Sequence, residues 1–168
     1  MTFPLAAAGG DRAFIELLAH VRWIVGGTGT SKSTLTEALA RRHNVLIYNG
    51  DRAEHGWVTR STQREHPHPR LFGAAPEQIR AGRSAREIFQ SMADPHGETI
   101  GFLIVDLLAL PCDRMVLVDY FGVLPRGLGP PVAGAHQAVF PLPPTEFRHR
   151  LEYRPDGTTT QSFRRIVR

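Results

Sequence analysis

Residues 26–34 read GGTGTSKST and bring together the three chemical groups that a phosphate-binding site needs. Small residues let backbone N–H groups wrap a phosphate, Lys32 can reach its outer oxygens, and the Ser33 hydroxyl can ligate magnesium. The pattern G-x-x-x-x-S-K-S differs from the usual phosphate-binding loop at one position, where a glycine normally precedes the lysine. That residue is Ser31, and a positive φ there would cost roughly 1 kcal/mol, which a tightly held loop can absorb.

The loop as a whole predicts a nucleotide site. The alternative interpretation is a glycine-rich turn between a strand and a helix with an incidental lysine. Against it, Lys32 is the only lysine among the 20 Lys and Arg residues of the chain. Arginine cannot replace the compact ammonium that lies between the β- and γ-phosphates, so a lone lysine at this position favours phosphate binding. The residues expected to bind the nucleotide are Gly26, Gly27, Thr28, Gly29, Thr30, Ser31, Lys32, Ser33 and Thr34.

Two carboxylates follow apolar runs that we predict to be strands. Asp51 lies just after the run at 44–48, where the carboxyl edge of a parallel sheet faces ligands, and it could orient or deprotonate an acceptor hydroxyl. The alternative is an Asp in an ordinary Asn-Gly-Asp turn. Asp119 closes MVLVD and suits a residue that holds magnesium or its water, with a helix or turn cap as the alternative.

Other polar residues are weaker candidates. Arg148, Arg150 and Arg154 fall in a predicted basic helix and could clamp transferring phosphate oxygens, or they are solvated surface residues. His66 and His68 alternate with prolines and lack the further ligands of a metal site. Cys112 is expected to be a buried thiol rather than a nucleophile. The residues after Asp51 that could line an acceptor pocket are His55, Trp57, Arg60 and Arg64.

The order of apolar segments predicts a parallel α/β sheet, because strand, glycine loop, helix and strand follow one another. Expected strands are 22–25, 44–48, 114–121 and the QAVFPL segment at 137–142. Expected helices are 12–21 capped by Asp11, 32–43 with Leu35, Ala38 and Leu39 on one face, 76–92 beginning at Pro76, 97–110, and 146–154. Residues 51–75 are expected to form a loop or an irregular helical segment.

Composition excludes several classes. At 168 residues the chain has the length of one domain, and no apolar run reaches the roughly 18 residues of a membrane span. A secretory signal is not expected, and a single cysteine fits a reducing cytoplasm. The net charge of +4 is scattered, so nucleic acid is an unlikely partner. The oligomeric state stays open, with a homodimer as one alternative.

The segment WIVGGTGTSKSTLTEALARRHNVLIYNGD resembles the opening of small P-loop kinases of the nucleoside- and nucleotide-kinase type, especially compact bacterial members described as AAA-family proteins. VLVDYFGVLP and PPTEFRHR are similar to the group's third strand and basic lid helix. The resemblance covers about residues 20–155. It implies a single three-layer P-loop NTPase domain over 1–168, with helices on both faces of a parallel sheet in the order 2-3-1-4-5. It also implies an acceptor-binding region at 51–95 and a lid at 145–157.

By position, the resemblance implies that ATP and Mg²⁺ bind at the loop, with Lys32 on the outer phosphates and Ser33 on the metal. Asp119 would support the metal, Asp51 would meet a small-molecule acceptor, and Arg148 or Arg150 would close from the lid. Two features depart from the group: Ser31, and a chain that ends soon after the lid. Either TQSFRRIVR supplies a shortened fifth strand or the base site is incomplete.

The predicted function is therefore ATP-dependent transfer of the γ-phosphate to a hydroxyl of a nucleoside or similar metabolite. The first alternative is an NTP hydrolase without a second substrate. The second is a nucleotide-binding or degenerate P-loop module with a regulatory or interaction role. The acceptor, and the choice between ATP and GTP, are open at this stage.

Overall fold

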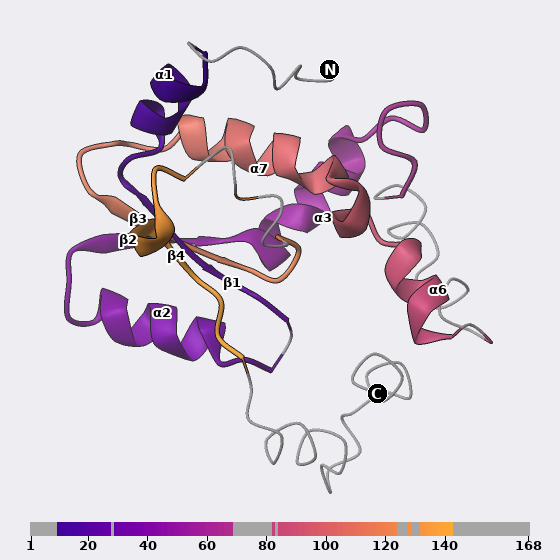
Figure 1. The fold of residues 1–168 in the computed structure, drawn as a ribbon, viewed down its shortest axis with the longest axis horizontal. Coiled ribbons are helices and arrows are strands. Elements are labelled where there is room, and N and C mark those ends of the chain that lie inside the picture. The colour runs from indigo at the N-terminus through magenta and orange to yellow at the C-terminus, as the bar shows by residue number, and fades with distance from the viewer. Residues whose placement is uncertain are drawn as a thin grey trace, which may run out of the picture.

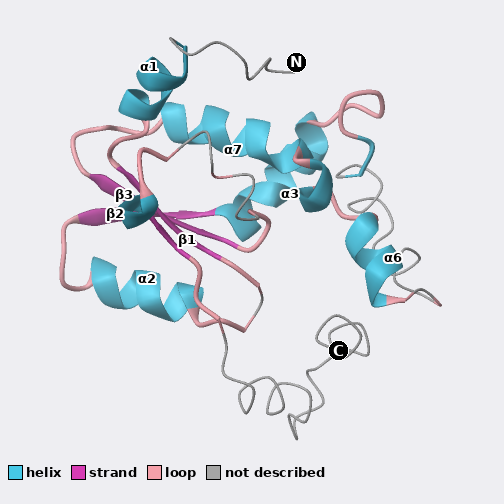
Figure 2. Ribbon diagram, viewed as in Figure 1, coloured by secondary structure: helices cyan, strands magenta, loops and turns pink. Residues whose placement is uncertain are grey.

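A four-stranded parallel sheet forms the centre of the molecule. The computed structural model describes residues 10–27, 29–68, 82, 84–123, 128 and 132–142. Among them, the strands lie in the order β2-β3-β1-β4 and every pairing is parallel. Figure 2 shows the strands in magenta with helices on both sides of them. Their bounds are β1 (Val21–Val25), β2 (Val45–Asn49), β3 (Met115–Tyr120) and β4 (Ala138–Val139). The predicted parallel α/β class is confirmed, while a fifth strand would fall beyond residue 142, outside the described residues.

Helices cover both faces of this sheet. In Figure 1, α2 (Lys32–Ala40) lies on one side of the strands, and α7 (Glu98–Leu108) lies on the other. α3 (Gly50–Arg60) packs against β3 and α7. The shorter helices are α1 (Gly10–Leu17), α6 (Ala85–Gln90) and the 3-10 turns η1 (Asp94–His96) and η3 (Ala135–Gln137). The described part is therefore a sandwich of helix, sheet and helix, which is compatible with a P-loop-like fold.

The register of the strands places Asp119 of β3 between the carboxyl ends of β1 and β2. It pairs with Ile24 of β1, just before the glycine loop, and with Asn49 of β2, just before Asp51. Because all these strands are parallel, their carboxyl ends meet at one edge of the sheet. The topology therefore brings the predicted loop, Asp51 and Asp119 to the same place.

Several sequence-based expectations need correction. Helix α1 begins at Gly10, so Asp11 lies inside the helix and does not cap it. Residues 50–60 form a regular helix within the stretch 51–75 that was expected to be a loop or an irregular helical segment. The Asn49 side chain accepts a hydrogen bond (2.8 Å) from the Arg52 backbone N–H and caps the first turn. In α2, Leu35 is exposed and the buried side is made by Lys32 and Thr36.

A hydrogen-bonded aspartate joins β2, α3 and α7. Asp106 of α7 accepts hydrogen bonds from the Tyr48 hydroxyl (2.7 Å) and the Trp57 indole N–H (2.7 Å) on the same oxygen, Oδ2. Arg60 forms an ion pair with the other oxygen, Oδ1, at 3.0 Å. Trp57 is fully buried, so this carboxylate satisfies a donor inside the core. The contacts fix α3 against α7 and thereby position the helix that begins beside Asp51.

Other expectations concern the surface and segments outside the described residues. Cys112 is exposed in the turn between α7 and β3, so the expected buried thiol is wrong. Within the described part of the chain, no helix combines the length and apolar character needed to cross a membrane. Pro76 and the predicted lid at 145–157, which includes Arg148, Arg150 and Arg154, lie outside the described residues.

Candidate functional site

The glycine loop runs from the end of β1 to the start of α2 in a left-handed conformation at three points. Gly26 has φ 144°, Gly29 has φ 79°, and Ser31 has φ 62°. Ser31 is the only non-glycine residue with positive φ in the part of the chain that the structure describes. It also precedes α2 without a side-chain capping bond. The chain therefore holds a serine in the backbone conformation that the usual loop glycine adopts at no steric cost.

Ser31→Gly is expected to raise the free energy of unfolding by up to about 1 kcal/mol. The substitution removes the steric penalty of a left-handed serine, and the greater freedom of glycine in the unfolded chain offsets part of the gain. Urea unfolding of the two proteins measures the difference.

The matched control is Ser33→Gly, which makes the same change two residues later, inside α2. Glycine in a helix is unfavourable, so this variant should lose about 0.5 kcal/mol. A loss of stability in Ser31→Gly as well would show that its backbone is not strained.

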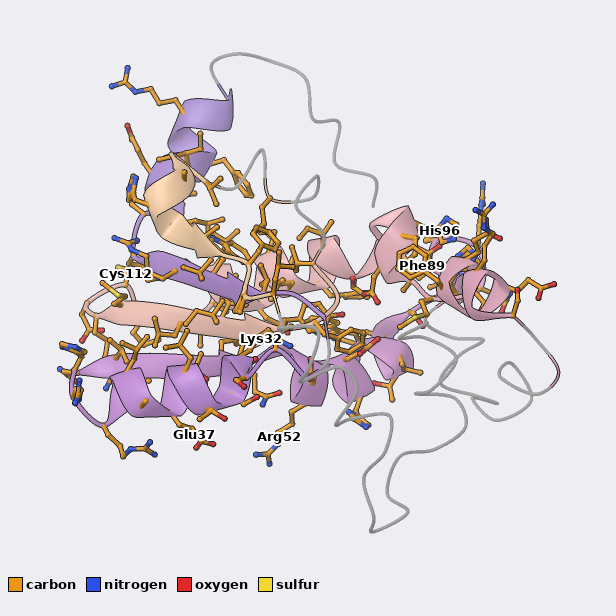
Figure 3. The ribbon with its side chains drawn as sticks, turned by 60° about the horizontal axis from the view of Figure 1, so that its bottom comes forward. Lys32, Glu37, Arg52, Phe89, His96 and Cys112 are labelled. Carbon is orange, nitrogen blue, oxygen red and sulfur yellow. The ribbon has the colours of Figure 1, made fainter. Side chains whose placement is uncertain are left out.

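Lys32 is the first residue of α2 and is buried, with 7% of its surface exposed. Its ammonium donates a hydrogen bond of 3.0 Å to the Gly27 carbonyl, which also accepts from the Thr30 hydroxyl at 2.9 Å. Burial lowers the pKa of Lys32, and the negative charges of Asp51 and Asp119 partly oppose this. Figure 3 shows the lysine well inside the molecule, whereas Glu37 and Arg52 point outward. Lys32 is thus a desolvated cation beside two carboxylates.

Asp119 and Asp51 approach Lys32 from the strand side of the site. Asp119 is 3% exposed near the end of β3. Asp51 lies in the first turn of α3, and its Oδ1 accepts a hydrogen bond of 3.2 Å from the Phe121 backbone N–H. Desolvation raises the pKa of Asp51, and the charge of Asp119 adds to the effect, while the bond from Phe121 and the charge of Lys32 oppose it. Asp51 is therefore a carboxylate tied to the sheet edge, rather than a turn residue.

One oxygen of this site has no protein partner. Asp119 Oδ1 is buried without a hydrogen bond, although a buried carboxylate oxygen normally has one. A hard cation such as Mg²⁺ prefers carboxylate and hydroxyl oxygens, often with one or two protein ligands and the rest from phosphates and water. Asp119 and the exposed Ser33 in the first turn of α2 fit such a cation. No group of three or more His, Cys, Asp or Glu residues in the described ranges is arranged to hold a metal.

Two further acidic residues near Asp51, Asp94 and Glu54, were not predicted from the sequence. Asp94 of η1 accepts hydrogen bonds from the Thr99 and Tyr120 hydroxyls, both at 3.2 Å. Burial raises the pKa of Asp94 to about 6 and that of Glu54 to about 7, and the charge of Asp51 adds to both shifts. Glu54 follows Asp51 by three residues on α3, so a helical reading of 50–60 would have placed the two on one face.

Glu54→Gln is expected to raise the free energy of unfolding at pH 8 by about 2–3 kcal/mol and to leave it unchanged at pH 4. Because folding raises the pKa of Glu54 from 4.5 to about 7, the folded chain favours the protonated acid. Its contribution to stability is complete below pH 4.5 and is lost as the pH rises through 7. Urea unfolding at both pH values measures this change.

The matched control is Glu37→Gln on the exposed side of α2, where the glutamate side chain is 64% exposed. This control variant should leave the pH dependence of the free energy of unfolding unchanged. A Glu54→Gln variant that is less stable at pH 8 would mean that the ionised carboxylate makes favourable contacts in the fold.

The structure describes the surroundings of several other predicted residues. Trp57 is fully buried in the core, so it does not line an acceptor pocket, and Arg60 pairs with Asp106. His55 is exposed, and its ring Nδ1 lies 3.2 Å from the Asp51 carbonyl. His66 packs on Phe102, while His68 contacts Glu98 at 2.5 Å and stacks on His96. Thr28, Arg148 and Arg150 lie outside the described residues, and the exposed Thr34 follows Ser33 in α2.

No protein-family model matches this chain, and no match was found among curated proteins or solved structures.

Proposed function

We propose that this chain is an ATP-dependent kinase that transfers the γ-phosphate to a hydroxyl of a nucleoside or similar small metabolite. The observation that carries the proposal is the meeting of Lys32, Asp51 and Asp119 at the carboxyl edge of a parallel sheet, beside a glycine loop that opens a helix. Phosphoryl transfer needs these parts: a backbone cradle, a flexible cation, a metal-supporting carboxylate and a carboxylate at the acceptor. A cytoplasmic location rests on composition alone.

In this proposal each residue of the site has a separate role in binding or catalysis. The backbone N–H groups of the loop hold the β- and γ-phosphates at the N-terminus of α2, and the Lys32 ammonium leaves the Gly27 carbonyl to reach the outer oxygens. Ser33 and Asp119 would hold Mg²⁺, which neutralises charge on the phosphates when bound. Asp51 orients the acceptor hydroxyl and accepts its proton as the oxygen attacks in line. Arg148 or Arg150 closes over the phosphates from the lid.

The acidic side chains near Asp51 define the acceptor end of the site. Asp51 and Glu54 come from α3, and Asp94 comes from η1 beside the Tyr120 hydroxyl. Carboxylate oxygens and a protonated acid bind hydroxyl groups, so these positions suit a polyhydroxyl acceptor. This is the reason for preferring a nucleoside or sugar-like metabolite to a protein substrate.

ATP with magnesium is expected to stabilise the wild-type chain and to have no effect on Lys32→Ala. At 100 times its dissociation constant, a ligand adds about 2.7 kcal/mol to the free energy of unfolding. Lys32→Ala removes the charge that binds the outer phosphate oxygens. Thermal unfolding with and without nucleotide measures both proteins, and GTP in place of ATP reports the base preference. Equal stabilisation of the two proteins would place the nucleotide away from the loop.

A transfer assay then separates the kinase from its alternatives. The wild-type chain is incubated with ATP labelled in the γ-phosphate and with a panel of nucleosides and sugars. Label appearing in an acceptor supports the kinase. Release of inorganic phosphate at the same rate with and without acceptors would identify a hydrolase. Binding of ATP without turnover on the whole panel would support the regulatory module instead.

A further inference from the structure

Lys32 lies close enough to two carboxylates, Asp51 and Asp119, for their negative charges to act on it. Its ammonium is bonded to the neutral Gly27 carbonyl, and in the described residues no ion pair within 4.0 Å joins it to Asp51 or Asp119. Both carboxylates nevertheless act on it electrostatically, and Asp119 Oδ1 is buried without a partner. One buried ammonium is therefore influenced by a buried carboxylate, Asp119, and by an exposed one, Asp51.

A divalent cation and this ammonium would compete for the same negative charge. Two like charges held close together in a partly desolvated site repel each other more strongly than they do in water. With Lys32 in place, a cation at Asp119 meets this repulsion. If the ammonium moves to bound phosphates, the two carboxylates lose their neighbouring positive charge, and a cation becomes favourable there.

We propose that Lys32 is the resting counter-ion of Asp119 and Asp51 and keeps divalent cations out of this edge until phosphate groups draw the ammonium away. The counter-ion role depends only on the described residues. The release by phosphate rests on the proposed function, and it predicts that nucleotide can bind before the metal.

The test uses Mn²⁺ and the full chain without nucleotide, with free Mn²⁺ measured by electron paramagnetic resonance. Lys32→Met keeps the length of the side chain and removes its charge, so it should bind Mn²⁺ at least about tenfold more tightly than the wild type. Lys32→Met with Asp119→Asn should lose this gain. Lys32→Arg, which keeps the charge, should resemble the wild type. Circular dichroism checks that each variant is folded.

Arg52→Met is the matched control, because Arg52 is an exposed cation in the same turn of α3 as Asp51. Removing its solvated charge should change Mn²⁺ affinity less than twofold. An unchanged affinity in Lys32→Met, or a gain that persists with Asp119→Asn, would overturn the counter-ion role.

A second arm separates this inference from the proposed function. With a chelator present, ATP alone should still stabilise the wild type and not Lys32→Met. If ATP with magnesium stabilises the wild type but Lys32→Met gains no Mn²⁺ affinity, nucleotide binding is retained and the inference fails. If Lys32→Met gains Mn²⁺ affinity but ATP stabilises neither protein with or without metal, the counter-ion role stands and release by phosphate fails together with the proposed function.

Discussion

Asp106→Ala is expected to lower the free energy of unfolding by about 3–5 kcal/mol. The change leaves the Tyr48 hydroxyl and the buried Trp57 indole N–H without their shared acceptor, and each hydrogen bond to a charged group is worth about 1.5–3 kcal/mol. The Arg60 ion pair adds little, because the arginine side chain is 46% exposed. Urea unfolding at neutral pH measures the loss.

Two further variants test the reason for this effect. Asp113→Ala removes an exposed aspartate from the turn after α7 and should change stability by less than about 0.5 kcal/mol. Asp106→Asn keeps one oxygen that can accept from both Tyr48 and Trp57, so it should cost less than alanine. If asparagine and alanine cost the same, the negative charge, rather than the shared acceptor, holds α3 against α7.

Asp51→Asn is expected to lower acceptor phosphorylation by about 10²–10⁴-fold, the range over which a general base contributes. Asparagine can still accept the hydrogen bond from the Phe121 N–H, so the fold of the sheet edge is kept. It cannot take the proton of the acceptor hydroxyl. Desolvation raises the pKa of Asp51, which brings this carboxylate closer to the operating pH of a base. The measurement is acceptor-dependent formation of ADP, with the acceptor found in the transfer assay.

The control for this variant is stabilisation by ATP with magnesium, which should equal that of the wild type because the proposed role of Asp51 is to contact the acceptor rather than the nucleotide. Arg52→Met changes the next residue and should leave the rate within about twofold. A fully active Asp51→Asn would show that the residue only ties α3 to Phe121 and that another group takes the proton.

The sequence was most informative about features that depend on residues close together in the chain. The run of glycines, Lys32 and Ser33 predicted a loop between a strand and a helix, and that connection is present. Helix α7 was predicted from apolar residues at helical spacing, and it runs from Glu98 to Leu108. These features depend on neighbours within a few residues, so a pattern of residue types is enough to indicate them.

The sequence was less informative about the acceptor side. Residues 50–60 are polar, and the polar composition hid a helix whose start depends on one capping side chain, Asn49. Glu54 and Asp94 are 40 positions apart, and the charge of Asp94 acts on Glu54 because the fold brings both to the end of β3. Pairing between distant segments leaves no trace in local periodicity.

The pattern of residue types was sufficient to predict the parallel α/β class, the loop and the candidate residues at the ends of two strands. Only the packed fold shows that Lys32 is buried where two carboxylates act on it, that Asp119 has a buried oxygen without a partner, and that Asp106 joins two helices and a strand. The physical reason is that burial and charge are properties of a packed neighbourhood. Parallel strands collect residues from remote parts of the chain at one edge, and only their packing sets which groups lose water and which face each other.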